Sequence, residues 1–181
     1  LGRGECVAGT CDYPRTSHLC EFGCSGGECN GTPGWSCTEL TCTHSSGLVT
    51  QREKNVTGTW DEAREGCEAL VYAGQSDWRL PTISELRTVV FGCPATEPGG
   101  ACGVTDDCAE WQSCWDLEGC QGCLPPGFYA PEELFSAFAG NDHWSGTSLA
   151  DDSDRAYVID FSYGQVAGWP KTNSFPSTCV R

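Results

Sequence analysis

The stretch Asp77-Trp78-Arg79-Leu80-Pro81, followed at once by Thr82-Ile83-Ser84-Glu85-Leu86, decides the fold. It holds two large apolar side chains, an Arg that we expect to be buried, and a Pro that stops the extended run. A segment with the pattern of a helix lies on each side of it. The stretch is therefore the hinge between two helices.

We expect this hinge to be architectural. Trp78 and Leu80 would anchor the core, Arg79 would pair internally, and Pro81 would set the start of the second helix. The hinge is therefore a signature of the fold and a poor candidate for a binding site.

A capping box opens each of the two helices. Thr59 and Glu62 begin the first, and Thr82 and Glu85 begin the second, so that side chains satisfy the free N–H groups of each first turn. Apolar residues three and four positions apart predict helices of about fifteen and ten residues, with Gly74 as the stop of the first. The inward stripes are Trp60, Ala63, Cys67, Leu70 and Val71, then Ile83, Leu86, Val89 and Val90.

Cysteine usage indicates an oxidising compartment. The 181 residues include 15 Cys, 23 Gly, 10 Pro and no Met. Thiols at this density persist where they can form disulfides, which predicts an extracellular or cell-surface protein. An odd total leaves at least one Cys free or bonded to another chain. No apolar run approaches the roughly 20 residues of a spanning helix, so we do not expect a membrane-spanning chain.

The charge balance argues against polyanionic partners. The net charge is −15, from 25 acidic and 10 basic residues. Nucleic-acid binding depends on Lys and Arg that neutralise phosphates, so we expect no nucleic-acid partner. The acidic balance is also that of an ordinary soluble secreted surface.

Residues 1–43 form a cysteine-rich appendage that disulfides would hold together. Seven Cys lie among small and polar residues, so a core of apolar side chains cannot supply the order. A zinc site at His18 with Cys11, Cys20 and Cys24 is the alternative, but such sites belong mostly to reducing cells, and disulfides are preferred. We expect the unpaired Cys in this segment, bonded to a neighbouring subunit.

Residues 93–128 form a cysteine-rich insert that loops out of the main domain. Six Cys predict three internal bridges, and Pro125-Pro126-Gly127 marks the exit. Trp111 and Trp115 either stack on sugar rings or pack over the bridges, and packing is preferred. Cys120 and Cys123 have the spacing of a redox motif, but no βαβ pattern surrounds them, so we expect no redox role.

Residues 129–181 predict a short helix from Pro131 and then hairpin strands over 156–161 and 165–169, with a turn at Tyr163-Gly164. Cys67 and Cys179 are the two Cys outside the clusters. The simplest pairing therefore joins the first helix to the last predicted strand, Ser177-Thr178-Cys179-Val180-Arg181. An unstrained bridge of this length contributes about 4 to 5 kcal/mol in the chain-entropy model.

Together these segments resemble the C-terminal domain family of the Legionella collagen-like adhesins, a bacterial branch of the C-type-lectin-like fold. The resemblance covers residues 44–92 and 129–181, in the family's order. It rests on Gly47-Leu48-Val49 with Gln51, Thr59-Trp60-Asp61-Glu62-Ala63 with Cys67, the hinge with Glu85-Leu86, Trp144-Ser145-Gly146-Thr147, Val158-Ile159-Asp160-Phe161 with Gly164, Lys171, and Cys179-Val180-Arg181.

The resemblance implies an α+β C-type-lectin-like domain over residues 44–181, with two helices flanking a small twisted antiparallel sheet. The termini would lie close together, and the role would be surface binding or adhesion. The residues expected to form the fold signature are Trp60, Trp78, Arg79, Leu80, Pro81 and Trp144.

Calcium is a candidate ion outside the appendage. The sugar sites of animal relatives use Glu-Pro-Asn or Gln-Pro-Asp, then Trp-Asn-Asp, but this chain has Glu97-Pro98-Gly99 and Asn141-Asp142-His143, so we do not expect that site. Asp151, Asp152 and Asp154 are a separate candidate, because alternate carboxylates can supply several oxygens to calcium. A solvated acidic turn is the preferred alternative for these three residues.

The candidate ligand-binding residues are Trp111, Trp115 and Tyr163, whereas core packing is the preferred role of Trp169. We do not expect an enzyme, because the chain has three His and neither a His-Glu-x-x-His nor a Gly-x-Ser-x-Gly motif. Glycosylation sequons begin at Asn30 and Asn55.

The sequence therefore predicts a secreted or cell-surface bacterial binding or adhesion protein that recognises a glycan or a protein. The alternative is a structural subunit of an extracellular filament or coat. In that case copies of the chain would assemble into a homo-oligomer through the appendage and the lectin-like domain.

Overall fold

The structure is a computed structural model that describes residues 34–53, 57–138 and 142–181, and the backbone of five short strands before them. These strands are β1 Glu5–Val7, β2 Thr10–Tyr13, β3 Thr16–Leu19, β4 Cys24–Ser25 and β5 Glu28–Cys29, in antiparallel sheets of three and two. The pairing of the first five Cys, the zinc alternative at His18, the unpaired Cys and both sequon Asn residues lie outside the described residues.

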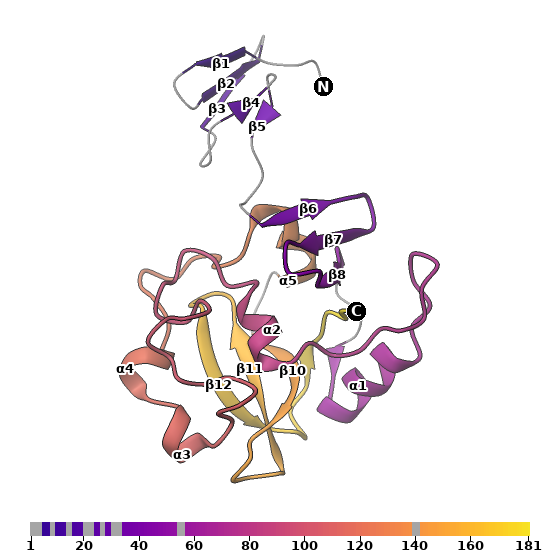
Figure 1. Ribbon diagram of the computed structural model, residues 1–181, viewed down its shortest axis with the longest axis vertical. Helices are drawn as coiled ribbons and strands as arrows, with labels where there is room; N and C mark the ends of the chain where they lie inside the picture. The colour runs from indigo at the N-terminus through magenta and orange to yellow at the C-terminus, as the bar shows by residue number, and fades with distance from the viewer. Residues whose placement is uncertain are drawn as a thin grey trace.

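The described body is a mixed α and β structure of small antiparallel sheets and short helices (Figure 1). Its central sheet has the order β10 Asp142–Ser148, β11 Arg155–Asp160, β12 Gln165–Pro170. A second sheet joins β6 Trp35–Cys37, β7 Thr41–His44 and β8 Val49–Gln51, and β9 Thr57–Gly58 pairs with β13 Phe175–Pro176. The helices are α1 Trp60–Glu68, α2 Ile83–Arg87, α3 Trp111–Cys114, α4 Leu117–Cys120 and α5 Phe135–Phe138, with the 3-10 turn η1 Glu132–Leu134. The division of the chain at residue 43 stays a prediction, and β7 runs across it.

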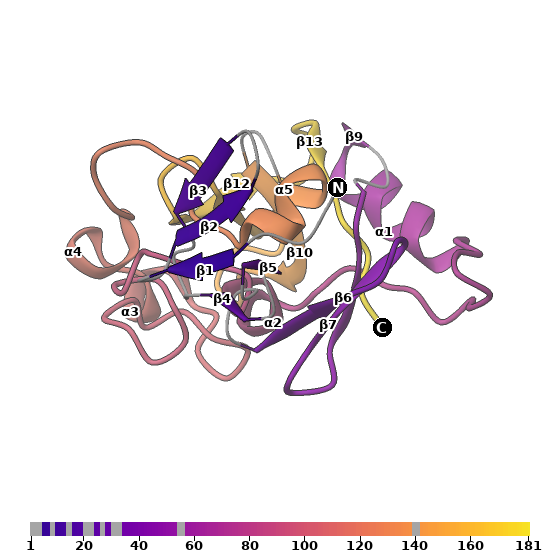
Figure 2. The ribbon, with the colours of Figure 1, turned by 90° about the horizontal axis from the view of Figure 1, so that it is seen from above.

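The central sheet has a hydrophobic core on each face, because successive strand residues point to opposite sides. Val158 packs with Cys67 of α1 on one face. Ile159 packs with Leu86 of α2 on the other face. Figure 2 shows α1 and the α3–α4 pair on opposite sides of the molecule, as does Figure 1. Helices α1 and α2 therefore pack on opposite faces of the small sheet.

The first helix is shorter than predicted. Its capping box forms between Thr59 and Glu62, but α1 has 9 residues and ends at the cap Ala69. Val71, which we placed on the buried stripe, lies beyond this end and is exposed. Gly74 is not the helix stop but shares a tight turn with Ala73, where φ is 75° and 50° respectively.

The second helix has 5 residues rather than about ten. Its predicted stripe nevertheless stays buried, because the chain continues in tighter turns. The N–H of Val89 donates to the carbonyl of Leu86 at 3.1 Å, and that of Val90 to Arg87 at 3.1 Å. These i to i+3 bonds are typical of a 3-10 geometry, which rotates Val89 and Val90 into the core.

The hinge pairs with the C-terminal end of the chain. Arg79 N–H donates to the Val180 carbonyl at 2.9 Å, and Val180 N–H donates to the Arg79 carbonyl at 2.8 Å. On the other side, Val49 and Arg181 exchange two bonds in the same way, at 3.0 and 2.9 Å. The C-terminal segment, residues 179–181, thus lies between β8 and the hinge. The C-terminus lies beside β8 in Figure 1.

The hinge side chains divide between the core and a surface ion pair. Trp78 and Leu80 are buried, as predicted. Arg79 is not buried, because its side chain is 46% exposed and pairs with Glu85. The Nη1 and Nη2 groups of Arg79 each donate to one oxygen of the Glu85 carboxylate, both at 2.6 Å. Glu85 also accepts from the Thr82 N–H at 2.8 Å, so one carboxylate fixes both the hinge and the start of α2.

Five disulfides join described residues. Cys67 and Cys179 are bonded, as expected from the sequence, and tie α1 to the C-terminal segment. The six Cys of the insert form three internal bridges, also as expected. The remaining bridges are Cys37–Cys42 across the β6–β7 hairpin and the nested set Cys93–Cys123, Cys102–Cys120 and Cys108–Cys114.

A buried Arg that the sequence analysis did not single out holds the insert against α2. Arg87 is 2% exposed, and its guanidinium donates to the main-chain carbonyls of Thr96, Glu97 and Val104. Burial lowers the pKa of Arg87, although a guanidinium remains charged in proteins. Its three neutral acceptors satisfy the buried donors and fix the course of the insert over residues 96–104.

Removal of the long disulfide should cost more stability than removal of the shortest bridge of the insert. The double variant Cys67→Ala, Cys179→Ala removes a disulfide between residues 112 apart in the sequence. The double variant Cys108→Ala, Cys114→Ala removes one between residues 6 apart. We expect losses of about 5 and about 2 kcal/mol in the free energy of unfolding, measured by urea denaturation. Equal losses would contradict the loop-entropy account.

Arg87→Met should destabilise the protein by about 3 kcal/mol, because three main-chain carbonyls, two of them buried, lose their donors. The matched control is Arg64→Met, since Arg64 forms ion pairs with exposed carboxylates of α1. That change should cost less than about 1 kcal/mol. Urea denaturation measures both, and a loss at Arg87 no larger than at Arg64 would show that the insert does not depend on this contact.

Candidate functional site

Two of the three predicted ligand-binding residues pack the insert onto the central sheet. The rings of Trp111 and Trp115 stack with centroids 4.3 Å apart, and the ring of Tyr157 lies 6.3 Å from Trp111. The indole N–H of Trp115 donates to the Val166 carbonyl at 2.7 Å. Both indoles therefore pack against the sheet, in agreement with the packing interpretation.

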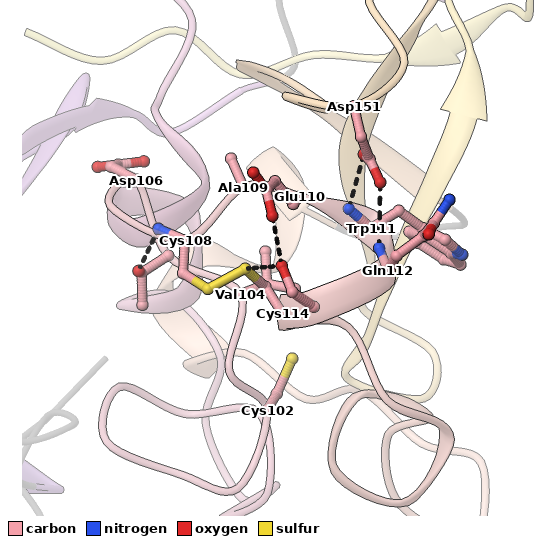
Figure 3. The surroundings of a disulfide bond; sticks show 12 residues. Cys102, Val104, Asp106, Cys108, Ala109, Glu110, Trp111, Gln112, Cys114 and Asp151 are labelled. Carbon is pink, nitrogen blue, oxygen red and sulfur yellow. Dashed lines mark hydrogen bonds between the residues drawn. A yellow bond between two sulfur atoms is a disulfide. The ribbon is translucent and has the colours of Figure 1, made fainter.

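Asp151 caps helix α3 from a distant loop, as Figure 3 shows. Its two carboxylate oxygens accept from the N–H groups of Trp111 and Gln112, at 2.8 and 3.1 Å. The hydrogen bond from Trp111, followed by that from Gln112, lowers the pKa of Asp151. The same figure shows the Cys108–Cys114 bridge beside this cap, so the acidic loop and the insert are joined at α3.

The described residues do not assemble the candidate calcium site at Asp151, Asp152 and Asp154. Asp152 accepts from the Asp154 N–H at 3.2 Å and contacts the Arg155 guanidinium at 3.4 Å, so its oxygens have partners within the loop. Across the described ranges, no three acidic, His or Cys side chains form a group that could hold a metal ion. The loop is therefore an acidic turn with internal partners.

The third predicted residue, Tyr163, lines an open pocket of about 410 Å³ beside the β11–β12 turn. Its walls come from the exit of the insert and from the start of β12. Trp111 lines a separate pocket of about 200 Å³ with Asp151, so the three predicted residues do not form one site. The lining residues of the Tyr163 pocket are Gln121, Gly122, Cys123, Leu124, Tyr163 and Gln165.

Close backbone contacts fix the walls of this pocket. The N–H of Cys123 donates to the Tyr163 carbonyl at 2.7 Å, and Cys123 is bonded to Cys93. Gly122 has a φ of +88°, and a Cβ there would collide with the Tyr163 carbonyl oxygen. Gly164 has a φ of +64°, and a Cβ there would lie 2.9 Å from the Cys93 Cβ. The two glycines therefore let the insert approach the turn.

The described residues that line the pocket are all uncharged, in a chain whose net charge is −15. Gln121 and Gln165 supply amides, Tyr163 supplies a phenol, and Leu124 adds an apolar side chain. Among the described residues, these amides and this hydroxyl have no hydrogen-bond partner. They are free to bind a ligand.

Sequence reasoning identified one of these residues and missed the others. Tyr163 was found because it is aromatic and lies in a turn. Gln121 and Gln165 are ordinary polar residues that are far apart in the chain, and only the Cys93–Cys123 bridge and the backbone contacts bring them together. The position of Gln165 directly after the turn was the one weak signal.

The structure also corrects the role of Trp169, which lies on β12 and is 41% exposed rather than in the core. Its ring contacts the edge of Phe175, with centroids 6.1 Å apart.

Asp142 lies across from Asp160 in the sheet register. Burial and then the nearby Asp160 raise the pKa of Asp142 to about 6, against a smaller lowering by a hydrogen bond from Trp169.

Asp142→Asn should raise stability at neutral pH. The pKa of Asp142 rises from 3.8 to about 6 on folding, so the folded chain holds the proton more tightly, and wild-type stability falls as pH rises through this window. The shift corresponds to about 3 kcal/mol, which partial exposure reduces to about 1 kcal/mol. Urea denaturation at about pH 4 and about pH 8 measures the difference in the free energy of unfolding between Asp142→Asn and the wild type. This difference should be small at the lower pH. A difference that does not change with pH would contradict this assignment.

The structure defines a small, disulfide-bonded mixed α and β domain with an open pocket beside the β11–β12 turn. The chain belongs to the Lcl C-terminal domain family, whose model matches residues 34–181. This confirms the family that the sequence resembles, and the match includes β6, β7 and the whole insert. A comparison with curated proteins gives no match. None of the helices in the described part of the chain is long and apolar enough to cross a membrane.

Proposed function

We propose that the chain is a secreted or cell-surface bacterial binding module with a C-type-lectin-like fold, which recognises a glycan or a protein. Family membership and the five disulfides support a surface protein of this kind. The helices on opposite faces of a small antiparallel sheet, and the C-terminal segment beside β8, support the fold.

The observation that carries this proposal is the uncharged pocket beside the β11–β12 turn. Its walls are fixed by a disulfide and by main-chain hydrogen bonds, whereas its polar side chains are free. A rigid wall that presents uncommitted donors and acceptors lowers the entropy cost of binding. The pocket is therefore suited to recognition of a polar partner.

Binding is proposed rather than catalysis. His143 is fully buried, and its Nε2 lies 3.1 Å from the Ala137 carbonyl oxygen. His44 is the last residue of β7, and its Nδ1 lies 2.9 Å from the Ser46 hydroxyl oxygen. Both imidazoles thus have local structural partners and lie outside the lining of the pocket.

The test combines imaging with a binding screen. Purified protein, viewed by negative-stain electron microscopy, should consist of dispersed particles, and labelled protein should bind members of a glycan array or proteins of a cell surface. Ordered polymers that bind neither would overturn the proposal and support the structural subunit of a filament or coat. Dispersed particles that bind neither would also overturn it.

A further inference from the structure

We infer that the pocket beside the β11–β12 turn binds an uncharged sugar, with the Tyr163 ring against one face of the sugar and the Gln121 and Gln165 amides on its hydroxyls. This inference rests on the proposed binding function. It adds the class of ligand and the residues that select it.

The polar groups of the pocket match the hydroxyls of a neutral sugar. A side-chain amide has two N–H donors and a carbonyl acceptor, so it can donate to one hydroxyl and accept from the next. Gln121 and Gln165 provide two such groups, and the Tyr163 hydroxyl can donate or accept. A ligand with several neighbouring hydroxyls would satisfy all three side chains.

The apolar groups match the other surface of a sugar ring. Tyr163 is 38% exposed and lines the pocket, and an aromatic ring supplies a flat apolar face for a ligand. Leu124 is also exposed and lines the same pocket. A pyranose has C–H groups on one face and hydroxyls around its edge, so it can use both kinds of contact at once.

Charge selects against acidic sugars. None of the described residues that line the pocket carries a charge, so a carboxylate or sulfate would lose water there without gaining an ionic partner from them. The net charge of −15 would also repel an anionic glycan as it approaches. A neutral ligand avoids both costs.

The geometry of the pocket is set before any ligand arrives. Cys123 is held by its disulfide to Cys93 and by its hydrogen bond to the Tyr163 carbonyl. The N–H of Gly127 donates to the Ser162 carbonyl at 2.9 Å, which extends this contact along the exit of the insert. Binding therefore needs to order only the three polar side chains.

The experiment measures binding of the purified protein to immobilised neutral, sialylated and sulfated oligosaccharides. The variants are Tyr163→Ala, Tyr163→Phe and Gln165→Ala, and the matched control is Leu117→Ala, an exposed apolar residue of α4 outside the pocket. Thermal melting confirms that each variant is folded. Tyr163→Phe keeps the ring and removes only the hydroxyl. It therefore tests the contribution of Tyr163 to binding even if Tyr163→Ala fails to fold.

We expect binding to neutral oligosaccharides that Tyr163→Ala and Gln165→Ala each weaken by about tenfold, the equivalent of about 1.4 kcal/mol. Tyr163→Phe should show a smaller loss, and Leu117→Ala none. Because the ligand is uncharged, affinity should change less than about twofold between low and high salt.

Three results would overturn the inference. Neutral binding that the pocket variants leave unchanged would place the sugar elsewhere, and the proposed binding function would stand. Binding to sialylated or sulfated glycans alone, or to cell-surface proteins alone, would reject the ligand class and leave the proposed function in place. Binding to no glycan and no protein would reject both.

Discussion

The rest of the body depends on the C-terminal segment lying between β8 and the hinge. Arg79 and Val180 exchange main-chain hydrogen bonds on one side of the segment, and Val49 and Arg181 do so on the other. The Cys67–Cys179 bridge then ties the same segment to α1. These contacts close the chain on itself, so both helices are held against the central sheet from opposite faces. The hinge is therefore architectural because it is the partner of the chain's end.

The insert is a fixed part of the body and forms one wall of the pocket. Its three nested disulfides order it from within, and Arg87 binds it to α2 through three carbonyls. Asp151 and the stacked pair of Trp111 and Trp115 join it to the sheet. A segment without a core of its own thus becomes rigid enough to present a binding surface. The proposed function lies where this insert meets the β11–β12 turn.

Local chemistry explains which predictions were right. The capping boxes at Thr59 and Thr82 form, because they depend on residues three apart. The helix lengths were wrong, since a buried apolar stripe continues equally well through the 3-10 turns at Val89 and Val90. The site was predicted only at Tyr163. The Asp151 loop, read as a calcium candidate, instead caps a helix whose start lies far from it in the chain.

The sequence by itself determined the family, the starts of the two main helices, the architectural role of the hinge and the division of the Cys residues into clusters. These properties depend on residue types at short, fixed spacings. Only the tertiary structure decided which side chains line the pocket, that Arg87 rather than Arg79 is the buried Arg, and that Trp169 is exposed. Such properties depend on which segments of the chain contact one another in the folded protein. These contacts are determined by disulfides between distant residues, by glycines that allow close approach, and by strand register.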